Sequence, residues 1–179
     1  MLFKTSFSDN EIHHYVDLTA SFIKTQKEAF HQLGTPLSTA EQETLKPFFS
    51  EGILHTTRFF LKTDGPIESP DFITELNERG ILFTLDMLKA VTFQDVIVAY
   101  EPLDAKVQFH ELVHAVQYQK MGLKQFANRY VRGLFMKGSY EGIPLEVNAR
   151  LLEQAFTRNS SEPFSVEQEV QRWINENRF

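Results

Sequence analysis

The pattern of apolar positions and capping residues predicts that most of this chain is helical. Ser8 to Glu11 forms a capping box, in which a serine and a glutamate three residues later cap the first turn of a helix. This helix is expected to run to about Leu33 and to stop at Gly34. Ser38 to Glu41 forms a second capping box, which predicts another helix ending near Phe49.

Proline, glycine and serine mark the ends of further predicted helices. Ser69 and Pro70 suit the N-cap and the first position of a helix that ends at Gly80. Ser165 to Gln168 caps a final helix, which bears Trp173. The remaining helices are expected at residues 105–121, 124–137 and 144–157.

Three segments favour strands over helices. Ile53 to Leu61 is rich in β-branched and aromatic residues and predicts a strand. The apolar runs Ala90–Phe93 and Val96–Ala99 are separated by Gln94 and Asp95, which predicts a hairpin without the glycine that two-residue turns prefer. The pattern as a whole therefore predicts an α+β fold, mostly helical, with a small sheet.

Composition narrows the class of protein. At 179 residues with 42% hydrophobic residues, the chain has the length and apolar content of one domain. It contains no cysteine, so any metal site must use histidine and carboxylate. A net charge of −6 does not predict a nucleic-acid partner. No run approaches membrane-spanning length, so we expect no membrane association and, by default, a cytoplasmic location.

A pattern with clear chemical meaning lies at His110-Glu111-Leu112-Val113-His114, which matches H-E-x-x-H. In a helix, histidines at i and i+4 lie one turn apart and differ by only about 40° in direction, so both imidazoles can reach one ion. Glu111 points about 100° away from His110, off the ligand axis but near enough to reach a metal-bound water. The pattern is short, so two helix histidines without a metal are the competing interpretation.

The surroundings of this pattern favour a helix. Asp104 suits the N-cap and Gly122 suits the position after the last turn, with no proline or glycine between them. One side of the predicted helix is apolar and lies opposite the two histidines; it comprises Phe109, Leu112, Val113 and Val116. We therefore expect an apolar face against the core and a polar face that carries the histidines.

A catalytic zinc usually takes three protein ligands, and two glutamates downstream could supply the third. Pro144 suits the first position of a new helix, which places Glu146 in its first turn on a rigid element. Glu141 precedes Gly142 and is expected on a loop, so Glu146 is the preferred ligand. Glu146 at this position would also complement the helix dipole without any metal.

Two motifs resemble those of small bacterial zincin-like domains, the gluzincin-type metallopeptidases. These proteins pair HELxHxxQ with a later helix that opens in P-x-E-x-x-A. Here Phe109–Tyr118 resembles the first motif and Pro144–Ala149 the second, and the resemblance covers roughly residues 53–155. One departure is Asn148, at a position where an acid is expected in the glutamate helix.

The resemblance implies a zincin-like fold in which the small sheet lies beside the H-E-x-x-H helix. It implies that His110, His114 and Glu146 bind Zn²⁺ and that Glu111 is the catalytic base. The expected organisation is a single zincin-like domain, residues 1–179, divided into N-terminal helices (1–50), a metallopeptidase-like core (53–157) and a C-terminal helix (165–178).

These observations predict a zinc-dependent, peptidase-like hydrolase that acts on a peptide or protein through a metal-activated water. The alternative is a catalytically inactive zinc-binding interaction domain, which would need the same ligands. Gln117 is a candidate for a hydrogen bond to a ligand. Tyr140 and Tyr118 are candidates for stabilising a developing oxyanion.

Overall fold

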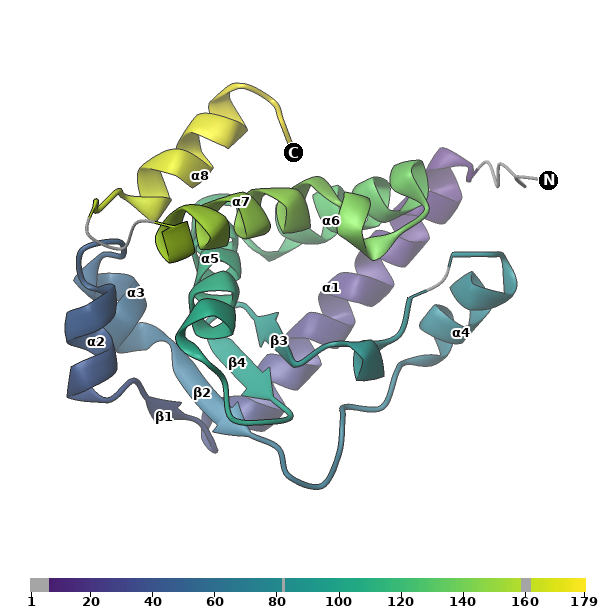
Figure 1. The fold of residues 1–179 in the computed structure, drawn as a ribbon. Helices are drawn as coiled ribbons and strands as arrows, with labels where there is room; N and C mark the ends of the chain where they lie inside the picture. The colour runs from purple at the N-terminus through teal and green to yellow at the C-terminus, as the bar shows by residue number, and fades with distance from the viewer. Residues whose placement is uncertain (1–6, 82, 159–161) are drawn as a thin grey trace.

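A computed structural model describes residues 7–81, 83–158 and 162–179, so residues 1–6 of the predicted N-terminal part lie outside it. The described chain is α+β and mostly helical, as predicted (Figure 1). Its helices are α1 (Asp9–His31), α2 (Thr39–Leu45), α3 (Glu51–Thr56), α4 (Asp71–Glu78), α5 (Ala105–Met121), α6 (Leu123–Lys137), α7 (Pro144–Arg158) and α8 (Val166–Asn175). Its strands are β1 (Thr35–Pro36), β2 (Arg58–Leu61), β3 (Ala90–Phe93) and β4 (Val96–Ala99). Two 3₁₀ turns are η1 (Leu85–Met87) and η2 (Tyr140–Gly142).

The four strands form one sheet in the order β1-β2-β4-β3. The central strand β4 pairs in parallel with β2 and antiparallel with β3, and Val96, Ile97 and Val98 are fully buried. The side chains of β4 alternate between two cores, as the pleat of a strand requires. Those of Val96 and Val98 pack in the core that contains α1, whereas those of Ile97 and Ala99 pack in the core that contains α5. Helices α1 and α5 therefore cover opposite faces of the sheet (Figure 1).

The predicted hairpin of β3 and β4 is confirmed, and β3 is an edge strand. Gln94 takes a positive φ of 61° at the turn, a conformation for which two-residue turns prefer glycine. The amide N–H of Tyr100 donates to the carbonyl of Lys89, so these two residues form a hydrogen-bonded pair. In an antiparallel ladder, hydrogen-bonded and non-hydrogen-bonded pairs alternate along the strands. By this alternation, the backbone groups of Ala90 and Thr92 face away from β4, toward the open edge of the sheet.

Helix α5 lies at the centre of the molecule and contacts α6, α7, α8 and β3. The expected helix ends are confirmed, because the Asp104 carboxylate accepts from the Val107 N–H and Gly122 has a φ of 75°. The predicted apolar face is fully buried. The polar face that was expected to carry the histidines is present, and three of its side chains, Glu111, His114 and Gln117, are also buried. The polar side of α5 faces other parts of the protein instead of bulk water.

The capping residues located the helix starts well and the helix ends less well. Both predicted capping boxes are present, at Ser8 and at Ser38. Helix α2 ends at Leu45 and not near Phe49, because Pro47 has no N–H to continue the helical hydrogen bonds. Helix α4 begins at Asp71, with Pro70 at the N-cap, one residue later than predicted.

The predicted strand Ile53–Leu61 is wrong in its first half, which belongs to α3, and correct in its second half, which forms β2. The adjacent residues Ile53 and Leu54 both pack into the core with α5. A strand would send these two neighbours to opposite faces, whereas a helical turn lets both reach the same core. Tertiary packing therefore overrides the β propensity of this segment.

Within the part of the chain that the structure describes, no helix combines the length and the apolarity needed to cross a bilayer.

The positive φ of Gln94 leads to a stability prediction. Gln94→Gly should raise the free energy of unfolding by about 0.5–1 kcal/mol, because glycine adopts this conformation without steric cost. Gln154→Gly, at an exposed position inside α7, is the matched control and should lower it by about 1 kcal/mol. Urea denaturation measures both changes, and a loss of stability in Gln94→Gly would contradict the prediction.

Candidate metal centre

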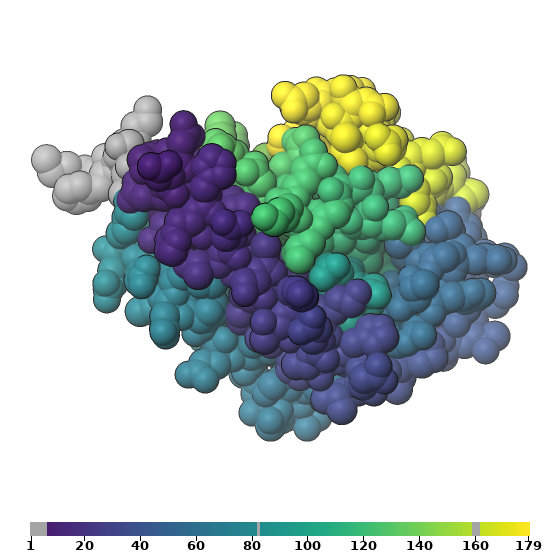
Figure 2. Space-filling view, turned by 180° about the vertical axis from the view of Figure 1, so that it is seen from behind, coloured from purple at the N-terminus to yellow at the C-terminus, as the bar shows by residue number. Residues whose placement is uncertain are grey.

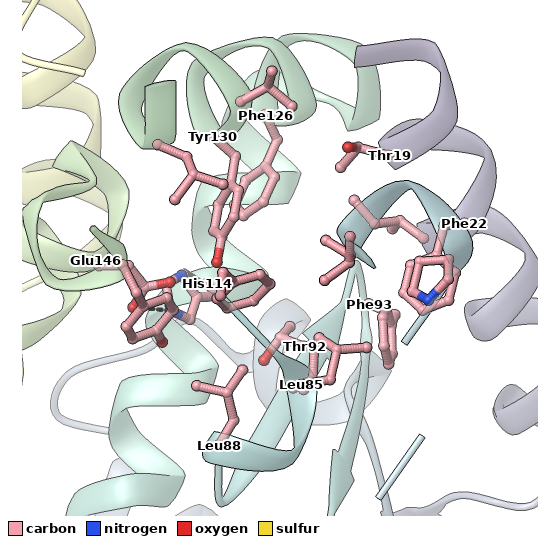
Figure 3. A pocket seen from close by; sticks show the side chains of 18 of the residues that line it. Thr19, Phe22, Leu85, Leu88, Thr92, Phe93, His114, Phe126, Tyr130 and Glu146 are labelled. Carbon is pink, nitrogen blue, oxygen red and sulfur yellow. Dashed lines mark ion pairs between the residues drawn. The ribbon is translucent and has the colours of Figure 1, made fainter. Parts of the chain in front are cut away.

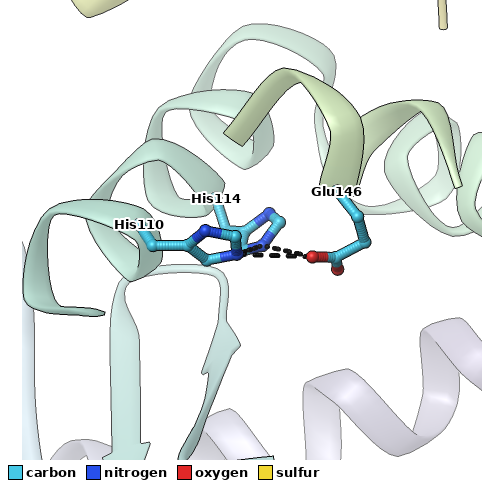
Figure 4. Close-up of side chains that lie close together, drawn as sticks. All are labelled: His110, His114 and Glu146. Atoms are coloured by element: carbon cyan, nitrogen blue, oxygen red, sulfur yellow. Dashed lines mark hydrogen bonds and ion pairs between the residues drawn. The ribbon is translucent and has the colours of Figure 1, made fainter. Parts of the chain in front are cut away.

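The three predicted ligands meet at one point, although they come from two helices (Figure 4). His110 and His114 extend from α5, and Glu146 extends from the first turn of α7, which begins at Pro144 as predicted. The Nε2 atoms of the two histidines are 3.1 Å apart. The Glu146 Oε2 atom lies 3.3 Å from Nε2 of His110 and 3.4 Å from Nε2 of His114.

This spacing fits a small tetrahedral cation. Zinc bonds to nitrogen and oxygen are about 2.0–2.2 Å long, so neighbouring ligand atoms of a tetrahedral ion lie about 3.3–3.5 Å apart. The three separations of 3.1, 3.3 and 3.4 Å are close to this range. Two imidazole nitrogens and one carboxylate oxygen also form a donor set typical of catalytic zinc. The site could therefore hold a metal ion without a large rearrangement.

Each histidine is oriented by a hydrogen bond at its other ring nitrogen. The Nδ1 atom of His110 lies 3.0 Å from Oε2 of Glu153, and Nδ1 of His114 lies 2.8 Å from Oε1 of Gln117. Because carboxylate and amide oxygens only accept, each Nδ1 must donate. The Nε2 atoms face Glu146 and are the atoms that can bind a proton or a metal. Histidines that ligate metals usually donate a hydrogen bond from the other ring nitrogen in this way.

The predicted role of Gln117 in supporting a ligand agrees with its contacts. Its side chain is fully buried, and its Nε2 atom donates to the carbonyl of Leu145 at 3.0 Å and to Oδ1 of Asn148 at 2.9 Å. Gln117 thus joins His114 on α5 to the beginning of α7. Asn148, the departure from the expected acid, supplies one of these acceptors.

Sequence reasoning missed Glu153, the partner of His110. Its carboxylate also pairs with Lys106 at 3.2 Å, so it joins α7 to the N-terminal part of α5. Glu153 lies two helical turns after Glu146, on the same face of α7. That spacing was the available signal in the sequence.

The buried carboxylates dominate the electrostatics of the site. Burial lowers the pKa of His110, but hydrogen bonds to Glu146 and Glu153 outweigh this effect and raise it to about 10. Burial raises the pKa of Glu146, yet the adjacent histidines lower it well below its usual range. The carboxylates that hold a proton on His110 would attract a metal cation equally, so protons and metal compete for the same nitrogen.

Glu111 lies beside the candidate ligands and is not in the group that could hold a metal ion. It is buried, and its carboxylate accepts a hydrogen bond of 2.6 Å from the hydroxyl of Thr92 on β3. Glu111, His114 and Glu146 line the same pocket, so the carboxylate faces the space next to the ligands.

Three tyrosines surround this space. The predicted candidates Tyr118 and Tyr140 both line the pocket. Tyr130 on α6, which sequence reasoning missed, points its hydroxyl toward His114 and Glu146 (Figure 3). Burial and the negative charge of Glu146 raise the pKa of all three phenols, so they remain hydrogen-bond donors at neutral pH.

The alternative ligand Glu141 is not in the group of side chains that could hold a metal ion. Its side chain is exposed in η2, and its backbone carbonyl accepts a hydrogen bond from Arg150. The helix start at Pro144 therefore aims Glu146, and not Glu141, at the histidines.

Comparison of this chain with protein-family models, curated proteins and solved structures found no match. The resemblance to gluzincin-type peptidases therefore rests on the two sequence motifs alone. The site is defined by its own geometry.

The choice between the two glutamates can be tested by zinc titration. Glu146→Ala should weaken zinc binding by more than the roughly 10- to 100-fold that loss of an outer partner typically causes. Glu141→Ala should leave it nearly unchanged. Competition with a chromophoric chelator gives the affinities, and thermal melts show whether zinc still stabilises each variant. A larger loss in Glu141→Ala would show that the loop carries the ligand.

A second prediction concerns the carboxylate behind His110. Glu153→Ala should weaken zinc binding by roughly 10- to 100-fold, because His110 loses the acceptor that orients its ring. Lys106→Ala is the control, since it removes the ion pair at Glu153 and leaves the bond to His110 in place. Equal affinities for the two variants and the unmodified protein would mean that Glu153 has no role in binding.

Proposed function

We propose that this protein is a zinc-dependent hydrolase of peptide bonds, with His110, His114 and Glu146 as ligands and Glu111 as general base. The observation that carries the proposal is the common pocket of Glu111, His114 and Glu146. A site that only stabilised the fold would be closed by a fourth protein ligand, whereas catalytic zinc sites keep a position open. Here two of the three proposed ligands, His114 and Glu146, border a pocket.

When bound, zinc would lower the pKa of a water molecule to about 7 and polarise a substrate carbonyl. Glu111 takes the proton from the attacking water and passes it to the leaving amine. The Thr92 hydroxyl holds one oxygen of the Glu111 carboxylate and leaves the other available for this proton. Tyr130 and Tyr140 supply phenol donors beside the ligands, where negative charge develops on the substrate oxygen.

The edge strand β3 favours an extended peptide as the substrate. The outward backbone groups of Ala90 and Thr92 can pair with a peptide that lies along the open edge of the sheet. All four residues of β3 line the pocket that also contains Glu111, and Thr92 touches the proposed base directly. A peptide paired with this edge would therefore pass close to the ligands.

Substitution of the base tests the proposed function. Glu111→Gln should keep zinc affinity nearly unchanged, because Glu111 is not a ligand, and should reduce peptide hydrolysis about 10²- to 10⁴-fold. Mass spectrometry of a peptide library, incubated with each zinc-loaded protein, measures the hydrolysis. Glu141→Gln, an exposed change outside the site, is the control and should cleave like the unmodified protein.

Two results would count against the proposal. If Glu111→Gln lost its zinc, then the roles of Glu111 and Glu146 would have been exchanged. If the unmodified protein bound zinc but cleaved no peptide in the library, the catalytically inactive binding domain would be the correct description.

A further inference from the structure

A pocket extends away from the candidate metal site and is lined mostly by aliphatic and aromatic side chains (Figure 3). We call this space the apolar cavity. Its volume is about 100 Å³. Its charged and titratable side chains gather at the end that contains Glu111, His114 and Glu146. At the far end lie Phe22 and Thr19 of α1 (Figure 3).

The apolar cavity passes around the open edge of the sheet. Thr92 of β3 faces α5 and the metal ligands, whereas Phe93 packs in the core with α1 on the other face. Both side chains line the same cavity, and so do residues of α1 and α4. Figure 2 shows the opposite side of the molecule, where α1, in purple, lies across the surface. Helix α1 therefore closes the cavity on the side away from the ligands.

Protein interiors are close-packed, so an apolar space of this size inside a small fold calls for an explanation. A structural role would be served better by side chains that filled it, because empty apolar volume destabilises a protein. Ligand sites typically have an apolar lining with a few polar groups at one place. In this pocket those polar groups are the proposed catalytic residues.

We propose that the apolar cavity is the specificity pocket of the metal site and takes an extended apolar group on the acyl side of the substrate's scissile bond. This inference rests on the proposed function. The carbonyl of the substrate lies at the ligands, and its apolar group passes β3 toward Phe22 and Thr19. Substrates with a small or charged group at this position leave the cavity unfilled or place a charge against apolar walls, and they bind weakly.

Aliphatic hydroxamates test whether the apolar cavity continues from the metal site, because the hydroxamate group chelates zinc and holds the alkyl chain beside it. The zinc-loaded protein is titrated calorimetrically with hydroxamates of two to eight carbons. Affinity should rise about fourfold with each added CH₂ group until the cavity is filled. Equal affinities for acetohydroxamate and octanohydroxamate would overturn the proposal.

Substitutions on α1 test where the alkyl chain of the hydroxamate lies within the cavity. Thr19→Trp fills the far end of the cavity. It should lower the affinity for octanohydroxamate at least tenfold and change the affinity for acetohydroxamate by less than twofold. Thr19→Asp, which adds charge with little bulk, should have the same selective effect. Thr25→Trp is the matched control, since Thr25 is exposed on the same helix, and it should change neither affinity. Unchanged affinities in both Thr19 variants would overturn the proposed path of the chain.

A metal-free measurement separates this proposal from the proposed function. N-phenyl-1-naphthylamine is neutral and apolar and has no chelating group, so its fluorescence should rise on binding to the chelator-treated protein. Thr19→Trp should reduce this binding and Thr25→Trp should not. Failure of zinc to bind would end the proposed function and, with it, the specificity role. Lack of probe binding in a protein that binds zinc and cleaves peptides would end only the cavity proposal.

Discussion

The contact between α5 and the first turn of α7 is the interaction on which the site depends. Helix α6 separates these helices in sequence, and the Glu146 carboxylate and the Gln117 amide rejoin them. Glu146 meets both imidazoles, while Gln117 binds one imidazole and the backbone at the start of α7. Burying a polar group without a hydrogen-bond partner destabilises a protein. These contacts therefore allow α5 to hold buried polar and charged side chains at the centre of the molecule. The geometry of the candidate metal site therefore depends on the same contacts that pack the two helices together.

The parts of this site that depend on local spacing could be predicted from sequence. His110 and His114 lie one helical turn apart, and Glu146 follows a proline that starts a helix, so short-range rules placed all three. The seven-residue spacing of Glu153 from Glu146 indicates only a shared helix face, and no local spacing indicates a role for Tyr130. Their roles arise only when α7 and α6 pack against α5, and that packing depends on contacts between distant segments.

The fold was predictable to a similar depth. Capping boxes and the β3–β4 hairpin are local features, and the structure contains them. The segment Ile53–Leu61 was only half correct, because its composition favours strand while the burial of two adjacent side chains favours helix. The apolar cavity was not predictable at all. Its walls come from α1, α4, β3 and α6, and the sequence pattern of a helix that borders a cavity resembles that of a helix that fills a core.

The candidate metal site and the far walls of the cavity lie on different helices, and this separation affects how the sequences of proteins with this architecture can change. The ligands and the proposed base lie on α5 and α7, whereas the far walls of the apolar cavity belong to α1 and α4. Substitutions on α1 and α4 can change the shape and length of the cavity while the ligand geometry is preserved. Selection could therefore alter what the cavity accepts without passing through variants that have lost the candidate metal site.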